Sequence, residues 1–426
     1  MIKKIIILIF CLSYLAVNFV ICLDSYIQRP TYEFTSIWYV ISGLIFAGLF
    51  YLLLRQKLSR WLWLLLLAVM VLAIFSVPTT SYDTFRYLFD GKMIVSYHVS
   101  PYQVLPIDLP ADQYSSYFYN IWWTQIYSPY GPLWQLVMSA INILSLDKLW
   151  LGLAALKIFN LTCYLWAAYL IYKLSGKKQL AYLFLLCPVM LFNNLATPHA
   201  DILIAALLLS AWYVRKKEWL GVWLGALAGL AKVYGWFLLP FWCGKKHIIR
   251  KFIYFLITGG VSLLLLKLIL GFKFWPMIKA AFIGGSGGGA ARGRLLIYQL
   301  FPWLSSSEGV IISLIIFLAL YLLIYRLFWK GKISDVGAGA LVSLLVPLLL
   351  LCLAYPWHFI IPLSFLFLWQ KKAAWLLLVY VCFYCFLAPL NLLMAILLFL
   401  VFILLFKFYE IIASRYLAVE KVGHSE

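Results

Sequence analysis

The residues most able to do chemistry in this chain gather in one stretch between two strongly apolar segments. Residues 78–131 hold four of the fourteen acidic residues of the chain, namely Asp83, Asp90, Asp108 and Asp112. The chain is 66% hydrophobic and 11% charged. Carboxylates beside membrane spans indicate a functional site, because a charge is costly to hold near hydrocarbon. An ordinary solvated loop is the simpler interpretation of the same acids.

Four polar side chains near the start of this stretch recur at helical spacing. In a helix that begins at Asp83, one face carries the side chains of Asp83, Arg86, Tyr87 and Asp90. We expect a short amphipathic helix lying on the outer membrane surface. A salt bridge between Asp83 and Arg86 is the simpler explanation of the spacing, although it does not explain why the helix lies between two spans.

The composition as a whole predicts a membrane protein. More than ten apolar runs approach the length of about 20 residues that a spanning helix needs. We therefore expect an all-α, polytopic integral membrane protein with about 12–14 transmembrane helices. The net charge of +20 comes mostly from short connections between these runs. Such connections indicate cytoplasmic loops, and a nucleic-acid partner is not expected.

The basic connections also predict which segments face outward. With Lys3 and Lys4 inside, all basic loops lie inside if residues 132–173 cross the membrane once. Segment 132–146 would then dip into the outer leaflet or continue the loop. This topology gathers the remaining polar residues on the non-cytoplasmic side: Asp83, Asp90, His199, Asp201, Lys232, segment 284–293 and His358.

The run from Trp219 to Trp242 is too short for two spans and too long for one. Basic loops flank both of its ends, so we expect it to enter and leave from the same side with Lys232 near its tip. A lysine at that depth is tolerated only where it faces a cavity or a partner such as an anion.

A glycine-rich segment, GGSGGGAARGR at 284–294, ends in Arg292 and Arg294. Glycine allows close approach of the backbone, and arginine offers a fork that fits phosphate. A flexible linker with two surface arginines explains the segment equally well.

Three groups of residues resemble the GT-C superfamily of membrane glycosyltransferases, most closely the polyprenyl-phosphomannose-dependent mannosyltransferases of bacteria. The groups are DTFRYLFDG at 83–91 with PY at 101–102 and YSPYGP at 127–132, then CP, NN and HAD within 187–201, then LAGLAK and LLP within 227–240. Ser100 and Ala200 stand where the family usually has Asn. This difference bears on which sugar is transferred more than on the type of reaction.

The resemblance implies that a hexose is transferred with inversion from a polyprenyl-phosphate carrier to a glycan or lipid acceptor on the non-cytoplasmic face. Mannose is the first candidate for this hexose. The resemblance also implies that Asp83 is the catalytic base, which deprotonates the attacking hydroxyl. Cations must meet the leaving phosphate, and Lys232 is the first candidate. The expected substrate-binding residues are Arg86, Tyr87, Asp90, Tyr102, Tyr130, His199, Asp201, Lys232, Arg292, Arg294 and His358.

No metal ligand or cofactor is assigned. The chain contains no Asp-x-Asp motif, although Asp83 and Asp201 could share a divalent ion across a cavity. His199 and Asp201 fit a hydrogen-bonded pair as well as a contact to the donor phosphate.

Two other functions remain open. A transporter or flippase for lipid-linked sugars would also have many helices and buried charges. A polymerase of lipid-linked glycans would work in the same compartment. We divide the chain into a GT-C-like catalytic module, residues 1–271 with outer loop 78–131, and C-terminal helices, residues 272–426.

Overall fold

The computed structural model of this chain describes residues 2–26, 37–53, 60–79, 81–113, 115–117, 122–242, 247–283, 306–350 and 355–369. Within these ranges the secondary structure is helical, with no strand. Arg292 and Arg294, with the rest of segment 284–294, lie outside the described residues, so their predicted contact with phosphate stays a prediction.

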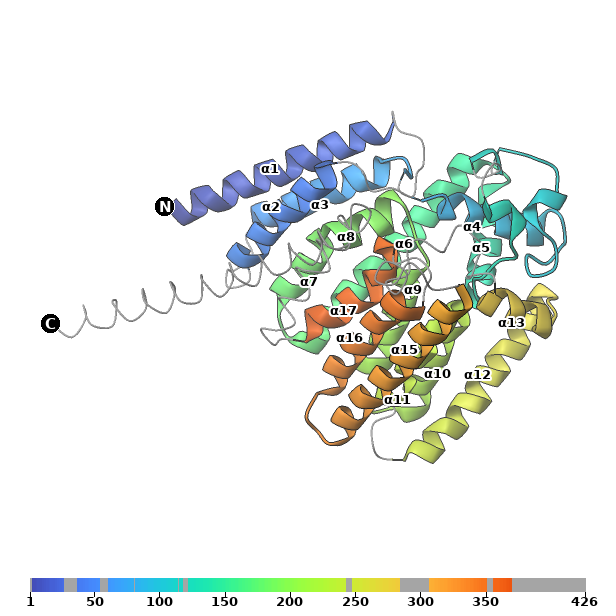
Figure 1. Ribbon diagram of the computed structural model, residues 1–426. Coiled ribbons are helices and arrows are strands. Elements are labelled where there is room, and N and C mark those ends of the chain that lie inside the picture. Colours follow the sequence, from blue (N-terminus) through green and yellow to red (C-terminus); the bar gives the residue numbers. More distant parts are fainter. Residues whose placement is uncertain are drawn as a thin grey trace.

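The helices follow one another closely along the chain (Figure 1). They are α1 (Ile2–Ser25), α2 (Ile37–Leu53), α3 (Arg60–Phe75), α4 (Asp83–Val95), α5 (Pro132–Ser145), α6 (Leu149–Ser175), α7 (Lys178–Leu186), α8 (Pro188–Leu191), α9 (Asp201–Tyr213), α10 (Glu218–Ala231), α11 (Leu239–Trp242), α12 (Ile248–Leu270), α13 (Phe274–Ile283), α15 (Ser306–Trp329), α16 (Asp335–Leu345) and α17 (Ile360–Leu368). Short helical turns join them: η1 (Pro106–Asp108), η2 (Ser115–Tyr117), η3 (Trp122–Gln125), η4 (Phe192–Ala196), η5 (Val233–Leu238), η8 (Val346–Leu350) and η9 (Pro356–Phe359).

Four of the described helices are long and apolar enough to cross a membrane: Ile5–Ser25, Leu149–Ser175, Ile248–Leu270 and Ile311–Trp329. Shorter apolar helices of 10–17 residues pack beside them. The predicted class, an all-α polytopic membrane protein, is confirmed. The total number of crossings stays a prediction, since residues 370–426 lie outside the described part.

The apolar segment from Lys178 to Ala196 is not one straight helix. It bends by 63° between α7 and the segment Pro188–Ala196. The bend lies at Cys187, which is extended (φ −61°, ψ 121°). Proline disfavours helical geometry in the residue before it and lacks an N–H to continue the helix. The break brings the connection from Thr197 to Ala200 into the protein interior, where all its residues are buried.

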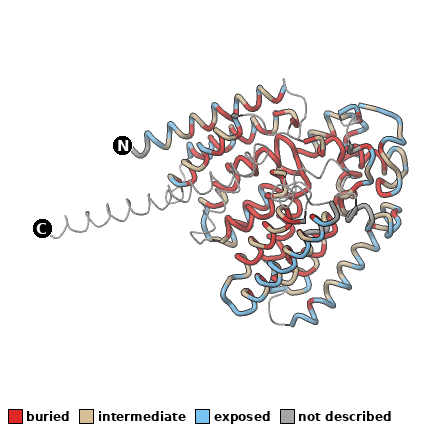
Figure 2. The backbone as a smooth tube through the Cα atoms, in the orientation of Figure 1, coloured by how far each residue is buried: buried red, intermediate tan, exposed pale blue. Residues whose placement is uncertain are grey.

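Helix α9 forms the centre of the bundle (Figures 1 and 2). Every residue from Asp201 to Trp212 is buried, and α6, α10 and α17 pack around it. A helix that is apolar on all sides is expected in such a position. Helix α12 is its opposite, since most of its apolar side chains are exposed, as a lipid-facing helix requires.

Helix α4 begins at Asp83 as predicted, but the expectation of an amphipathic helix with one open face is wrong, and its place relative to the membrane surface stays a prediction. Every residue from Asp83 to Met93 is buried. Helix α5 packs closely along α4, because a Cβ at Gly91 would lie only 2.3 Å from the Met138 carbonyl oxygen. The alternative pairing of Asp83 with Arg86 is also wrong, since the guanidinium of Arg86 binds Asp90, 2.7 Å away.

Helix α5 has 14 residues, so it is about 21 Å long, shorter than a hydrocarbon core of about 30 Å. Leu146 and Asp147, both with positive φ (50° and 57°), turn the chain into α6. This geometry agrees with a single crossing by residues 132–173.

Lys232 lies at the tip of a helical hairpin, as predicted. The backbone becomes extended there (φ −159°, ψ 125°), and η5 folds back along α10. The indole N–H of Trp236 donates to the carbonyl of Ala226 at 3.1 Å, which closes the hairpin.

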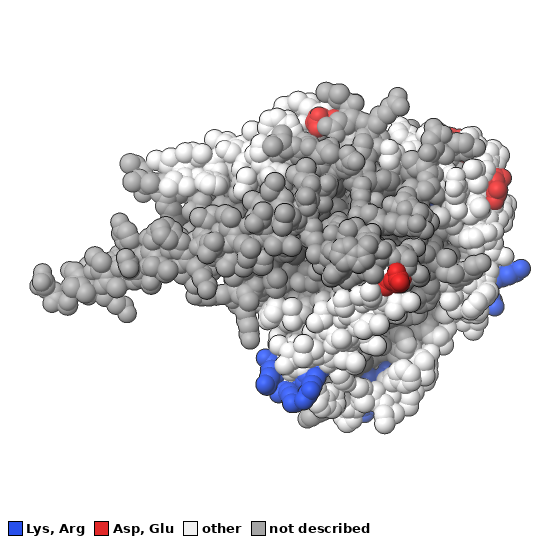
Figure 3. Space-filling model, viewed as in Figure 1, with Lys and Arg blue, Asp and Glu red and all other residues white. Residues whose placement is uncertain are grey.

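Basic connections lie at the opposite end of α9 and α10 from Asp201 and Lys232. There Arg215 pairs with Asp335 at the start of α16, and Arg250 Nε donates to Glu218 at 2.9 Å. Figure 3 shows basic side chains gathered at the lower end of this face, where α15 joins α16.

The contact at Gly91 generates a stability prediction. In an open helix, alanine would be favoured over glycine by about 1 kcal/mol. At Gly91 the added methyl must push α4 and α5 apart, so we expect Gly91→Ala to destabilise the protein by about 1–3 kcal/mol. Thermal unfolding in detergent measures the change.

Gly260→Ala is the matched control, because no described atom lies within 4 Å of a Cβ at Gly260 in α12. Its unfolding temperature should stay equal or rise. An equal or raised unfolding temperature for Gly91→Ala would show that the α4–α5 contact is looser than the structure has it.

Candidate active site

Asp83 is the first residue of α4, and its backbone N–H donates to Ser81 Oγ at 3.0 Å. Its carboxylate is almost fully buried: Oδ2 accepts a hydrogen bond from the Tyr130 hydroxyl at 3.1 Å, and Oδ1 has no partner among the described residues. Burial raises the pKa of Asp83 to about 6, against the opposing effects of Lys232, Tyr130 and Ser81. The group can therefore hold and release a proton near neutral pH.

Tyr130 is held in place through its backbone. The N–H of Gly131 donates to the Ala231 carbonyl at 2.9 Å, and the Tyr102 hydroxyl donates to the Tyr130 carbonyl at 2.8 Å. A Cβ at residue 131 would lie 2.1 Å from the Leu230 carbonyl oxygen, so only glycine allows this approach. The turn before α5 is thereby fastened to the end of α10.

Lys232, the residue that follows α10, forms an ion pair with Asp201. The lysine Nζ lies 3.3 Å from both carboxylate oxygens. The Asp201 side chain is 0% exposed, whereas that of Lys232 is 13% exposed and also lies over the Tyr130 ring. The buried acid therefore fixes a cation that stays accessible from the site.

His199 lies on the other side of Asp83. Its Nδ1 is 3.3 Å from the Tyr87 hydroxyl and 3.8 Å from Asp83 Oδ2. Burial, followed by the charge of Lys232, holds the pKa of His199 well below its usual range. The imidazole is therefore neutral and positions Tyr87 and Asp83 without forming an ion pair with the carboxylate. Its Nε2 has no hydrogen-bond partner among the described residues.

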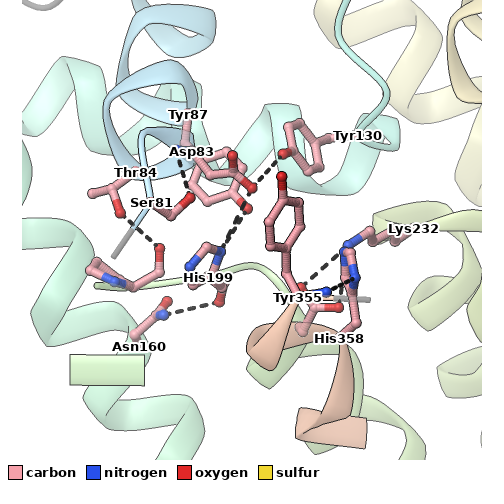
Figure 4. A network of polar contacts seen from close by, with 12 residues as sticks. Ser81, Asp83, Thr84, Tyr87, Tyr130, Asn160, His199, Lys232, Tyr355 and His358 are labelled. Carbon is pink, nitrogen blue, oxygen red and sulfur yellow. Dashed lines mark hydrogen bonds and ion pairs between the residues drawn. The ribbon is translucent and has the colours of Figure 1, made fainter. Parts of the chain in front are cut away.

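Turn η9 closes the site from the C-terminal part of the chain. Trp357, 2% exposed, stacks on His199 with ring centroids 4.2 Å apart, and Tyr355 stacks on Trp357 at 4.4 Å. The Tyr355 backbone N–H donates to His358 Nδ1 at 3.3 Å. Figure 4 shows the phenol of Tyr355 pointing toward Tyr130 and Asp83.

The structure brings together seven of the residues predicted from the sequence. They are Asp83, Tyr87, Tyr130, His199, Asp201, Lys232 and His358.

Arg86, Asp90 and Tyr102 lie behind the site, where they support it. Gln135 Nε2 donates to Asp90 at 3.1 Å, and Arg86 Nη1 donates to the Ile126 carbonyl at 3.2 Å. The ion pair of Arg86 and Asp90 is fully buried. Removing one partner would leave an uncompensated charge, at a cost of about 3–5 kcal/mol. These two residues hold α4, α5 and the loop between them in register.

Tyr355 was missed by the sequence analysis. The signal that could have found it is Tyr-Pro-Trp-His at 355–358, a proline turn rich in aromatics after an apolar run. Another turn with proline and aromatic residues occurs at 127–132, around Tyr130. Among the described residues, no group of three or more His, Cys, Asp or Glu side chains could hold a metal ion.

The chain matches a family of known proteins. Residues 16–244 match the family described as "Alpha-(1->6)-mannopyranosyltransferase, N-terminal domain". The match includes Asp83, Tyr130 and Lys232, and Tyr355 lies beyond it. No curated protein and no solved structure matches the chain.

The surroundings of Asp83 generate a titration prediction. Difference infrared spectroscopy of the protonated carboxyl band, assigned with Asp83→Asn, should give a midpoint near pH 6. Lys232→Met should raise this midpoint, because it removes the cation that favours the carboxylate. Lys216→Met, at an exposed position between α9 and α10, should leave it unchanged. A midpoint that falls in Lys232→Met would contradict the electrostatics described above.

Proposed function

From the premise that the chain belongs to the α-(1→6)-mannopyranosyltransferase family, and is thus a glycosyltransferase, we propose that it transfers mannose from a polyprenyl-phosphate carrier to a glycan or lipid acceptor with inversion. The family match confirms the resemblance seen in the motifs. It also supports enzyme over transporter or flippase as the main activity. A glycan polymerase would need the same base and differs in its donor.

One observation carries the proposed mechanism: the buried carboxylate of Asp83, whose Oδ1 has no hydrogen-bond partner among the described residues, faces the same site as the cation of Lys232. In the ionised form, Oδ1 accepts the proton of an acceptor hydroxyl as that oxygen attacks the anomeric carbon. The bond from the anomeric carbon to the phosphate oxygen breaks, and its electron pair leaves with the phosphate. Lys232 stabilises the charge that develops there.

The stereochemistry follows from this arrangement. A single displacement inverts the anomeric carbon, so an α-linked product requires a β-linked mannosyl phosphate donor. The attacking oxygen and the leaving phosphate then lie on opposite sides of the sugar. Asp83 would act on the side of the attacking oxygen, and Lys232 on the side of the leaving phosphate. Tyr130 lies between these two residues, because its hydroxyl donates to Asp83 and its ring lies beneath Lys232.

The charge distribution supports an active site on the non-cytoplasmic face. Asp201 and Lys232 lie at one end of α9 and α10, and the basic connections lie at the other end. Lysine and arginine collect on cytoplasmic loops. The long apolar carrier would then reach the site from the outer leaflet, between lipid-facing helices.

Asp83→Asn tests the base. The amide cannot accept the proton, so we expect transfer to fall by about 100-fold or more. Release of polyprenyl phosphate from polyprenyl-phosphomannose, in nanodiscs with a panel of acceptors, measures the activity. In the wild type, kcat/KM should rise with pH through about 6, as Asp83 ionises. Asp108→Asn, at an exposed carboxylate of the same loop, is the control and should retain activity.

Equal release by the wild type and Asp83→Asn would remove Asp83 as the base. Absence of release by folded wild-type protein with every lipid-phosphate mannose and acceptor would overturn the choice of donor.

Lys232→Ala tests the phosphate contact. The substitution removes a charge that is needed most in the transition state, so we expect kcat/KM for the donor to fall by about 100-fold. Lys232→Arg should restore part of this loss, since it keeps the charge. Steady-state kinetics at saturating acceptor measures both variants. Turnover of Lys232→Ala at the wild-type rate would exclude the proposed role.

A further inference from the structure

Tyr355 is positioned to touch the transferred sugar. We propose that its hydroxyl hydrogen-bonds a hydroxyl of the mannosyl ring and thereby helps to select the hexose. This inference rests on the proposed function and adds a specificity residue from outside the matched residues 16–244.

The backbone around Tyr355 directs the side chain into the site. Tyr355 is extended (φ −75°, ψ 156°), and Pro356 begins η9 directly after it. Proline fixes its own φ and keeps the preceding residue extended, so the phenol leaves the chain in a defined direction. The contact between Tyr355 N–H and His358 Nδ1 closes the turn.

Packing then holds the ring of Tyr355 while leaving part of it accessible. One face lies against Trp357, with an interplanar angle of 14°, and Trp357 in turn lies against His199 at 9°. Trp357 is buried, whereas Tyr355 is half-buried. A stack of three rings thus connects the C-terminal part of the chain to the residue beside the Asp83 carboxylate. A phenol held in this way is preorganised for a directional hydrogen bond.

The direction of the phenol indicates what it contacts. In an inverting displacement, the base and the leaving phosphate flank the sugar. Tyr355 points toward Asp83 and Tyr130, in the same site as Lys232 (Figure 4). A group between the base and the cation lies beside the sugar ring, where a phenol can donate to or accept from a ring hydroxyl. A site that hydrogen-bonds a substrate hydroxyl discriminates strongly against analogues that lack it.

The test crosses one protein change with one substrate change. Wild type and Tyr355→Phe are assayed in nanodiscs with polyprenyl-phosphomannose and with its 2-, 3-, 4- and 6-deoxy analogues. We expect the wild type to lose about 10- to 100-fold in kcat/KM on at least one analogue. Tyr355→Phe should show a similar loss on intact donor, and no further loss on that analogue.

Tyr355→Phe keeps the ring that stacks on Trp357, so folding should be preserved, and thermal unfolding checks this. Tyr213→Phe is the matched control, because Tyr213 is 48% exposed at the far end of α9 from Asp201. It should show the wild-type pattern on all five donors.

Additive losses on every analogue, or unchanged kcat/KM for Tyr355→Phe on intact donor, would overturn the inference and leave the proposed function standing. Failure of the wild type to release polyprenyl phosphate from intact donor is a separate result, which would overturn the proposed function and the inference with it.

Discussion

The buried ion pair between Asp201 and Lys232 is the contact on which the site depends. It joins the first residue of α9 to the residue that follows α10, in the interior of an apolar bundle. Either charge alone would be costly to bury there. Each charge makes the other tolerable. Because Asp201 is enclosed and Lys232 is partly open, the pair presents a positive charge to the site.

Two opposing effects set the pKa of Asp83, the proposed base. Burial disfavours the charged form of Asp83, whereas Lys232 and the hydroxyl of Tyr130 favour it, and the resulting pKa of about 6 lies between these extremes. The neighbouring imidazole, His199, stays neutral for the same reason that Asp83 becomes a stronger base. Low solvent exposure therefore gives one histidine a positioning role and one aspartate the proposed role of base.

Much of this site could be predicted from the sequence. Charge counting along the chain gathered Asp83, His199 and Lys232 on one side of the membrane, and the hairpin with Lys232 at its tip followed from the length of its apolar run. The burial of α4 could not be predicted, because helical spacing shows which residues share a face and not what covers the opposite face. Tyr355 was missed for a related reason: Trp357, on which it stacks, meets His199 through the packing of segments far apart in the chain.

The close approach at Gly131 has a mechanical consequence. Its N–H bonds the carbonyl of Ala231, next to Lys232, and the preceding residue, Tyr130, bonds Asp83. The proposed base and the proposed phosphate-binding cation are therefore linked through two hydrogen bonds, Tyr130 to Asp83 and Gly131 to Ala231, and through the backbone that joins Tyr130 to Gly131 and Ala231 to Lys232. Asp83 and Lys232 therefore belong to one structural unit, and the spacing between them is set before the sugar binds. Movement needed to admit the proposed lipid carrier must then take place in the helices around this unit, which itself moves as one body.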